Sequence, residues 1–467
     1  MSRKALTAVF GATTRAMSGV KYSQDDIVLR NKTKLMVGDG NMAGAIMNKT
    51  LEGWIKDGWE VDILKVTAPK NSREGVRQYF FDGALPPQGK KYGEIWLGYK
   101  PTHFNAKSKE DLRKFATEDT LVVSLLAGVT IDSIKEGLGV KMVGRIMTNT
   151  NAIYGNAQSC LTTSRNLPEK TLGRLGLDLK SIGDVHLVTE DRVNDFTAAA
   201  ASSPAAYHAL FGAIERMLNK RGLSEQEARG VIFDSVTHNP RDVSVYTPKV
   251  KEALLELEMS TEKGKEGRGK GSIEGTIIKA SNKLGDCSKE ELSCFTSGVV
   301  TRFSKAFILS SERDLGFGSG MSHTIISGKK GVVIGCAINA EKSGKSFLDL
   351  QNAVTSVKGT TEELLQSVVC GTGRGWDELV GDGLRACSEK GSEIGNPLKY
   401  YLGKTSKHLV GSTNAVLDAA QQELVAVHNE SKQALMRLQE ERPSTSATKA
   451  AIEKVVGPEK GGDDKSH

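Results

Sequence analysis

The sequence predicts an α/β protein in which an N-terminal doubly wound parallel sheet is followed by an all-helical domain that carries an α+β insertion. Short apolar runs alternate with helical patterns from residue 34 to about residue 190, which is typical of successive β-α-β units. Alanine-rich segments with helical spacing of their apolar residues follow residue 191. A glycine-rich, mixed-charge stretch at residues 261–271 then interrupts the helical pattern and indicates a hinge.

Composition limits the classes of protein to consider. The chain has 467 residues, of which 38% are hydrophobic and 25% charged, as in a globular protein of two or three domains. No run approaches the roughly 20 apolar residues of a membrane helix, so we expect no membrane span. Basic residues form no stripe interleaved with aromatic residues, so we expect no nucleic-acid partner. The six cysteines and eight histidines lack metal-ligand spacing, so we expect no metal site.

Residues 1–24 are predicted to form a mitochondrial transit peptide. They are rich in serine, threonine, alanine and basic residues and contain no acidic residue. Leu6, Val9, Phe10 and Met17 could share one face of a helix. A disordered basic arm is the alternative. The transit-peptide interpretation places the mature protein in the mitochondrial matrix.

Residues 31–190 are predicted to form the domain with the sheet. Strands are expected at residues 34–37, 61–66, 94–99, 121–126, 141–147 and 185–188. Behind the first strand, Ala43, Ile46, Met47, Trp54 and Ile55 have the spacing of one helical face, with a glycine placed to end the helix. This order of elements is typical of a dinucleotide-binding Rossmann-type domain.

The turn between the first strand and the first helix has the spacing of a dinucleotide-binding motif. Gly38, Gly40 and Ala43 occupy its three small-residue positions, which allow the backbone to approach a pyrophosphate at the helix N-terminus. By itself the motif is equally consistent with a structural turn. Lys65, Lys70 and Arg73 follow the second strand and would suit the 2′-phosphate of NADP, although a solvated loop explains any one of them equally well.

The second half of the chain is predicted to be mainly helical. Residues 191–245 form the first part of a helical dimerisation domain, in which Ser224 and Glu227 have capping-box spacing. Residues 246–345 are an insertion with strand-like runs at 275–281, 323–327 and 331–340, and its glycine cluster at 316–322 is more typical of a turn than of a phosphate loop. Residues 346–402 form the second helical part, and residues 403–467 a C-terminal helix with a disordered tail.

Several stretches resemble the pyrroline-5-carboxylate reductase family in their order and spacing. They are VGDGNMAGAI, LGYKP, LVVSLLAGVTIDSIKEGL and RIMTNTNAIYGNA, and residues 347–395 resemble the last helices of the family. The resemblance covers roughly residues 34–239 and 347–395. It implies reduction of the imine of 1-pyrroline-5-carboxylate to proline with NADPH, with NADH as the other candidate cofactor. It also implies a homodimer or higher homo-oligomer through the helical domain.

The resemblance also implies which residues form the site. The cofactor would contact Gly38, Gly40, Asn41, Met42, Ala43, Lys100, Pro101, Ala127, Gly128, Asn149 and Thr150. The substrate carboxylate would lie at a helix N-terminus formed by Ser356, Gly359, Thr360 and Thr361. Thr361 also matches a hydroxyl that contacts the imine nitrogen and is the candidate catalytic residue. Because an iminium group accepts hydride readily, we expect the chain to contribute mainly positioning.

Five positions depart from the family pattern. The family loop Ser-Gly-Ser-Gly-Pro-Ala-Tyr is AASSPAAY here, with Ala201 and Ser203 in place of glycines. Lys358 replaces a glycine of the carboxylate loop, Asn151 replaces a proline, and Asp39 places a negative charge near the expected pyrophosphate. Two interpretations therefore stay open. The protein is an active reductase, or it is a catalytically silent paralogue that serves as a structural subunit of a mitochondrial complex.

Overall fold

The computed structural model describes residues 31–65, 76–81, 85–165, 167–237, 246–262, 273–355, 359–369 and 375–395. The chain divides into two compact units, Met1–Pro397 and Leu398–His467, and the described residues all belong to the first. The predicted transit peptide and the predicted C-terminal helix and tail lie outside the described residues. So do Lys70, Arg73, Ser356 and Lys358.

The described strands form one eight-stranded sheet in the order β3-β2-β1-β4-β5-β6-β7-β8. Their bounds are β1 Thr33–Val37, β2 Glu60–Lys65, β3 Arg77–Phe80, β4 Glu94–Leu97, β5 Leu121–Ser124, β6 Met142–Met147, β7 Ala157–Thr163 and β8 Gly183–Leu187. Neighbouring strands are parallel except β6 and β7, which are antiparallel. The order reverses at β1, which lies between β2 and β4, so the carboxyl ends of these strands form the usual ligand-binding edge.

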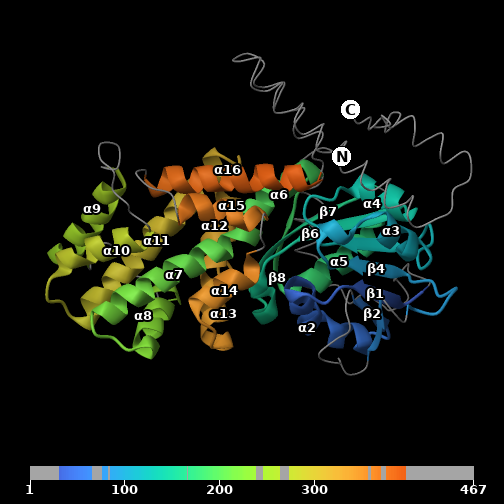
Figure 1. The fold of residues 1–467 in the computed structure, drawn as a ribbon, viewed down its shortest axis with the longest axis horizontal. Coiled ribbons are helices and arrows are strands. Elements are labelled where there is room, and N and C mark those ends of the chain that lie inside the picture. The colour runs from blue at the N-terminus through green and yellow to red at the C-terminus, as the bar shows by residue number, and fades with distance from the viewer. Residues whose placement is uncertain are drawn as a thin grey trace, which may run out of the picture. The chain divides into compact units, whose positions relative to one another are not determined.

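Helices cover both faces of the sheet, which confirms the doubly wound prediction. They are α2 (Asn41–Lys56), α3 (Ala106–Arg113), α4 (Ile131–Leu138) and α5 (Glu169–Lys180). Alternate strand residues enter two separate cores: Met36 packs with residues of α2 and α5, whereas Leu35 packs with residues of α3 and α4. Figure 1 shows α2 on one side of the strands and α3 and α4 on the other.

The predicted helix behind the first strand is α2. Ala43, Ile46, Met47 and Trp54 are buried as expected, whereas Ile55 is 43% exposed. The helix ends at Lys56, and Gly58 follows it with a φ of +80°. A residue without Cβ adopts this conformation readily, so the predicted terminator is confirmed.

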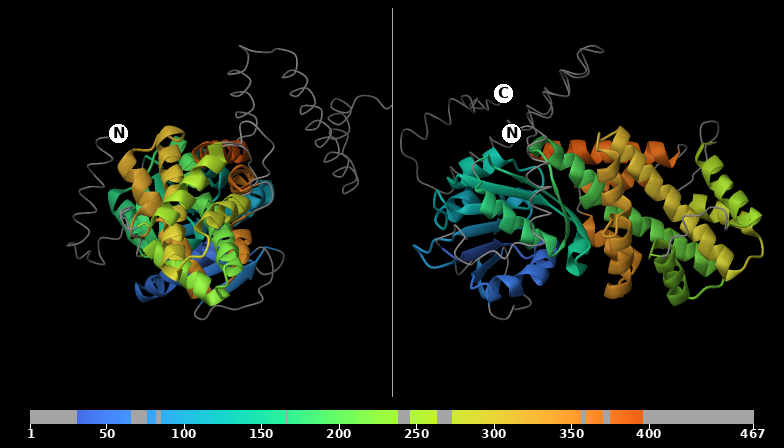
Figure 2. Two further views of the ribbon diagram at one scale, coloured as in Figure 1. Left: turned by 90° about the vertical axis from the view of Figure 1, so that its left-hand side faces the viewer. Right: turned by 180° about the vertical axis from the view of Figure 1, so that it is seen from behind.

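The chain after residue 190 is helical throughout its described parts, as Figure 2 also shows. The helices are α6 Val193–Phe196, α7 Ser203–Lys220, α8 Glu225–Thr237, α9 Pro248–Glu262, α10 Ile273–Ser281, α11 Lys289–Arg313, α12 Ser319–Ser327, α13 Val332–Ser343, α14 Phe347–Val354, α15 Thr360–Val368 and α16 Trp376–Gly395. Most residues of α7 are buried, because α8, α10, α13, α14 and α15 pack around it. The predicted capping box is present: Glu227 N donates to Ser224 Oγ (3.3 Å), and Ser224 N donates to Glu227 Oε2 (2.9 Å).

The prediction of strands within the insertion is wrong. Residues 275–281, 323–327 and 331–340 lie in α10, α12 and α13 or next to their first residue. In α10 the buried residues Ile273, Thr276, Ile277 and Ala280 have helical spacing. Burial against α7 and α9 therefore outweighs the strand preference of the β-branched residues. Of the glycine cluster at 316–322, residues 316–318 form the connection before α12, with Gly316 at a φ of +64°, whereas residues 319–322 begin the helix.

Two strands escaped prediction, β3 and β7. The edge strand β3 has only four residues and is partly exposed. In β7 the buried side chains include Gln158, Ser159 and Thr162. Their polarity hides the apolar pattern by which strands are recognised, although hydrogen bonds make burial acceptable; Gln158 Nε2 donates to Lys330 O (2.8 Å).

Candidate functional site

The glycine turn lies tightly packed at the carboxyl ends of β1, β2 and β4. Gly38 has a φ of +92°, and a Cβ atom there would lie 2.8 Å from the carbonyl oxygen of Gly98. Gly38 N donates to Leu64 O (2.8 Å), and a Cβ on Gly98 would lie 2.6 Å from Cβ of Ala43. Glycine is therefore required at position 38, and the small residue at position 43 is needed for close packing of the helix against β4.

The start of α2 faces open space. Gly40 is the N-cap residue, has no side-chain cap, and would have no heavy atom within 4 Å of an added Cβ. The first turn of α2 contains no acidic residue. The first backbone N–H groups of a helix have no partner within it and carry the positive end of the helix dipole. The turn therefore fits a dinucleotide pyrophosphate, which needs both a close approach and N–H donors.

Asp39, in the middle of the turn, forms an ion pair. Lys65 at the end of β2 lies with Nζ 2.6 Å from Asp39 Oδ2, and the lysine side chain is 5% exposed. The negative charge of Asp39, which was expected to lie near a pyrophosphate, is thus paired with the positive charge of Lys65. Asp62, by contrast, lies farther back on the same strand, where it pairs with Lys90 (2.6 Å) and Arg77 (2.9 Å).

The loops after β4 and β5 share this edge of the sheet because both strands run parallel to β1. Lys100 is exposed and precedes a short 3₁₀ helix that begins at Pro101. Ala127 and Gly128 lie between β5 and α4, and Gly128 has a φ of +75°. The structure therefore places these four predicted cofactor residues at the same edge as the glycine turn.

The Asn-Thr pair after β6 lies beside α2. Asn149 is buried; its Nδ2 donates to Ala200 O (2.9 Å), and its Oδ1 accepts from Asn151 N (3.2 Å). Thr150 begins a 3₁₀ segment, η3 (Thr150–Tyr154), which packs against α2, and its hydroxyl oxygen is buried without a hydrogen-bond partner among the described residues. This turn thus connects the cofactor edge with the helical region.

The insertion helix α13 covers the same turn from outside. Asn151 Nδ2 approaches Val332 O to 3.5 Å, and a Cβ on Gly335 would lie 2.4 Å from that nitrogen. Asparagine at the position of the family proline is therefore explained by contact with the insertion. The insertion is part of the packing around the candidate site.

The predicted carboxylate site is a cluster of hydroxyl groups at the start of α15. Gly359 is the N-cap residue, with extended backbone. Thr361 Oγ1 donates to Ser202 Oγ (3.2 Å), and Thr360 Oγ1 lies 3.3 Å from the same oxygen. Ser202 and Thr361 are both buried. Burial also raises the pKa of the neighbouring Cys387 thiol to about 12, so this cysteine is not a nucleophile at neutral pH.

One contact joins the start of α2, next to the glycine turn, to α14. Asn41, the first residue of α2, donates from Nδ2 to Ala353 O (3.0 Å) near the end of α14. α15 begins a few residues further along the chain, at Thr360. Asn41 and Ala353 thus lie next to each other although they are more than 300 residues apart in the sequence.

Two residues at the site escaped prediction. Ser202 ends a π-helical segment, η5 (Thr197–Ser202), within the altered AASSPAAY stretch. Arg145 is buried in β6 and pairs with Glu190 (2.9 Å), whose Oε1 also accepts from Ile131 N (2.6 Å) at the start of α4. This pair fixes the end of the loop that holds Ala127 and Gly128. A charged residue within an apolar strand pattern was the available signal for Arg145.

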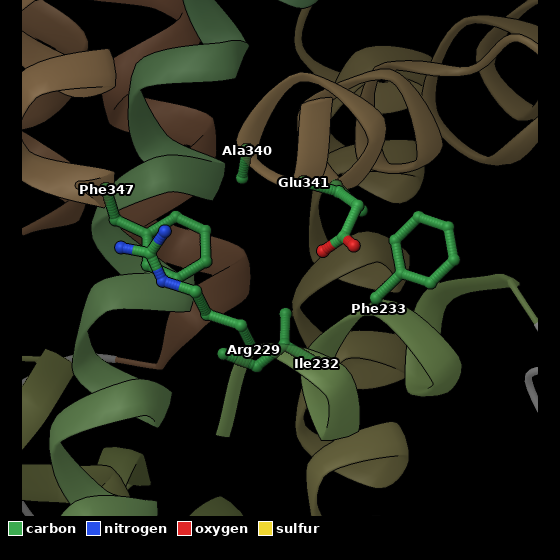
Figure 3. Close-up of a pocket in the computed structure, with 7 residues that line it drawn as sticks. Arg229, Ile232, Phe233, Ala340, Glu341 and Phe347 are labelled. Atoms are coloured by element: carbon green, nitrogen blue, oxygen red, sulfur yellow. The ribbon is translucent and has the colours of Figure 1, made fainter. Parts of the chain in front are cut away.

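A pocket between α8, α13 and α14 is too small to be the substrate site. It is lined by Arg229, Ile232, Phe233, Ala337, Ala340, Glu341 and Phe347. Its volume is about 10 Å³, room for about one water molecule. Figure 3 shows the Arg229 guanidinium against the Phe347 ring, 5.5 Å from its centroid, and Arg229 also pairs with Glu215 (2.9 Å).

The described residues contain no group of three or more histidine, cysteine, aspartate or glutamate side chains arranged to hold a metal ion. None of the helices in the described ranges is both long and apolar enough to cross a membrane.

Comparison with known proteins identifies the family. No family model matches the chain. Pyrroline-5-carboxylate reductase of Staphylococcus aureus is 31% identical over 199 residues, which are 41% of this chain and 71% of that protein. Pyrroline-5-carboxylate reductase 2 of Bacillus subtilis is 27% identical over 278 residues, 57% of this chain and 98% of that protein.

Solved structures with similar folds include 1-pyrroline-5-carboxylate reductase of Streptococcus pyogenes. It is 18% identical, with a TM-score of 0.37, over 58% of this chain and 97% of that one. Plasmodium falciparum pyrroline carboxylate reductase with NADP bound is 15% identical, with a TM-score of 0.39, over 56% and 98% of the chains. The chain belongs to the pyrroline-5-carboxylate reductase family, because it is 31% identical to the Staphylococcus aureus protein over 71% of that protein's length.

Proposed function

We propose that this protein is an NADPH-dependent reductase that transfers hydride to the imine carbon of 1-pyrroline-5-carboxylate and yields proline, with NADH as the other candidate donor. The observation that carries the proposal is the contact between Asn41 and Ala353 (3.0 Å). It brings the open N-terminus of α2 next to the segment that leads to the hydroxyl cluster of α15. Hydride transfer requires the cofactor and the imine to lie next to each other.

In this proposal the glycine turn holds the cofactor. Gly38 and Gly40 would permit the close approach, and the first N–H groups of α2 would donate to the pyrophosphate. Asn149, Thr150 and the loop at Ala127 and Gly128 would hold the nicotinamide half. When bound, the cofactor supplies the hydride. The chain itself orients the two reactants and excludes water.

The substrate would be held at the start of α15. The N–H groups after Gly359 and the hydroxyls of Ser202 and Thr360 would bind the carboxylate, and the Thr361 hydroxyl would contact the imine nitrogen. Each of these hydroxyls now donates to or accepts from another member of the cluster. Substrate binding would therefore require these hydroxyls to exchange their hydrogen bonds with one another for hydrogen bonds to the substrate.

The proposal is tested first by cofactor binding and then by catalysis. Full-length protein is titrated with NADPH and NADH and followed by nucleotide fluorescence. Oxidation of whichever nucleotide binds is then measured in the presence of 1-pyrroline-5-carboxylate. Saturable binding and turnover are expected. Absence of binding of both nucleotides would reject the reductase function.

We predict that Thr361→Ala lowers kcat/KM for the imine about tenfold to hundredfold. A hydrogen bond to a charged group contributes about 1.5–3 kcal/mol, and the variant lacks that donor. Thr361→Ser is the matched control, because it keeps the hydroxyl, and should stay close to wild type. Equal loss in both variants would assign Thr361 a packing role, and unchanged kcat/KM in both would remove it from the site.

A second candidate function is that of a catalytically silent paralogue acting as a structural subunit of a mitochondrial complex. The observation that favours it is the first turn of α15, where Glu362 and Glu363 place two negative charges. Acidic side chains there stabilise the helix dipole but oppose a substrate carboxylate. Cofactor binding without turnover of the imine would support this second function.

Location in the mitochondrial matrix and assembly as a homo-oligomer are also part of our proposal. The basic, serine- and alanine-rich composition of residues 1–24 supports import. The family resemblance of the helical domain supports self-association. Subcellular fractionation and a native mass of the purified protein test these two points.

A further inference from the structure

We infer that the Asp39–Lys65 ion pair balances the charge of the pyrophosphate-binding turn, so that Lys65 supports NADPH and NADH equally instead of selecting the 2′-phosphate. The inference rests on the proposed cofactor site. It gives a different role to a lysine whose position at the end of β2 is typical of 2′-phosphate recognition. It also explains how an acidic residue is accommodated within the glycine turn.

The register of the sheet creates the pair. β1 and β2 are parallel, with Val37 opposite Leu64, so the residues that follow Val37 meet the end of β2. Gly38 N donates to Leu64 O (2.8 Å), which fixes the turn against that strand end. Asp39 Oδ2 then lies 2.6 Å from Lys65 Nζ.

The burial of the two side chains is unequal. The lysine is 5% exposed and the aspartate 33% exposed. The lysine side chain is thus enclosed by the protein, whereas the aspartate of the turn is partly open to solvent. A lysine that is buried in this way needs a counter-ion, because burial of an unpaired charge is costly.

The effect of the pair on an anion follows from Coulomb's law. A carboxylate between Gly38 and Gly40, without a counter-ion, would repel a pyrophosphate at the N-terminus of α2 and cancel part of the helix dipole. With the Lys65 ammonium at 2.6 Å the two charges sum to zero. The N–H donors of the turn can then act on the pyrophosphate without net repulsion.

The two cofactors separate the possible roles of Lys65. Both contain the pyrophosphate, but only NADPH contains the 2′-phosphate. Charge balance at the turn predicts equal effects of substitution on both cofactors. Recognition of the 2′-phosphate predicts an effect on NADPH alone.

The test is a double-mutant cycle on the full-length protein. Dissociation constants of NADPH and NADH are measured by fluorescence titration for wild type, Lys65→Met, Asp39→Asn and the double variant. Lys65→Met should weaken both cofactors about tenfold, and Asp39→Asn should tighten both about threefold. The double variant should bind both cofactors only about threefold more weakly than wild type, because the opposite effects of the two charges on the pyrophosphate add.

Lys141→Met is the matched control. Lys141 pairs with Glu118 (2.9 Å) just before β6, and both side chains are more than half exposed. This variant also removes one lysine charge from an ion pair, and cofactor affinity should be unchanged. A tenfold loss in this control would show that net charge alone explains the result and would overturn the inference.

Other outcomes are equally decisive. Loss of NADPH affinity alone in Lys65→Met would make Lys65 a 2′-phosphate ligand, and a double variant as weak as Lys65→Met would show that the Asp39 charge does not act on the cofactor; each overturns the inference. If Lys65→Met does not fold, as judged by circular dichroism, Asp39→Asn decides by tightening both cofactors or by failing to. Failure of wild type to bind either nucleotide would instead reject the proposed function.

Discussion

The two ends of the parallel sheet use their polar groups in opposite ways. At the amino end, Lys34 on β1 and Glu94 on β4 form a buried ion pair with a distance of 2.7 Å. Arg174 on α5 contacts the same carboxylate (2.6 Å) and also pairs with Asp178 (2.9 Å). At the carboxyl end, Gly40 and Asn41 are exposed where the glycine turn meets the start of α2.

Tryptophan rings enclose the amino-end cluster. Lys34 Nζ lies 3.9 Å from the ring centroid of Trp59 and 4.6 Å from that of Trp54, while Trp96 Nε1 donates to Glu94 Oε1 (2.5 Å). Burial lowers the pKa of Lys34 to about 8, although the Glu94 charge opposes this shift. The pKa of Glu94 is lowered, because Arg174 and Lys34 outweigh the effect of its burial.

The difference shows which end serves stability and which serves binding. A buried polar group contributes to a stable fold when its partners come from the chain itself. Donors that face open space contribute little to folding and are available to a ligand. Substitutions at the amino end should therefore change stability, and those at the carboxyl end should change cofactor affinity.

The largest effect is expected for Glu94→Ala. The substitution leaves two buried cations without their shared carboxylate, which should destabilise the fold by about 3–5 kcal/mol. Urea unfolding measures the change. The matched control, Glu118→Ala, breaks an exposed pair with Lys141 and should leave stability unchanged. Equal stability of both variants would mean that the buried ion-pair cluster does not stabilise the fold.

The next effect separates two glycines of one turn. Gly38→Ala should cost about 2–4 kcal/mol, because alanine is strained at a φ of +92° and its Cβ would meet Gly98. Gly40→Ala should cost about 1 kcal/mol or less, since its surroundings are open, yet it should weaken cofactor binding. Thermal unfolding and fluorescence titration together measure both. Normal cofactor affinity of folded Gly40→Ala would contradict the proposed site.

The last effect is a change in the pH dependence of stability. The pKa of Lys34 is about 8 in the folded protein and 10.5 without burial, so the folded state releases this proton first. Stability should therefore rise with pH between about 8 and 10.5, by up to 1.4 kcal/mol per pH unit, relative to Lys34→Met. Denaturant unfolding across this range measures it. Parallel pH profiles of stability for wild type and Lys34→Met would show that Lys34 stays protonated throughout this pH range.

The sequence predicted the sheet domain and the position of its glycine turn because the signals there are local. Gly38 is required by the conformation of one turn and by its close approach to Gly98, and the strands around it are short apolar runs. Gly58, Ser224 and Glu227 act within a few residues of their own helix ends. Such features depend little on the rest of the fold, so they were predicted correctly from neighbouring residues alone.

Tertiary structure alone decided the rest. Ile277 and Ile325 lie in helices because packing within the helical region outweighs their strand preference. Strand register places Lys65 beside Asp39, and the chain returns Ala353 to Asn41 after more than 300 residues. A sequence shows the charges and hydrogen-bonding groups that are present, but their partners depend on distances that only the folded chain sets.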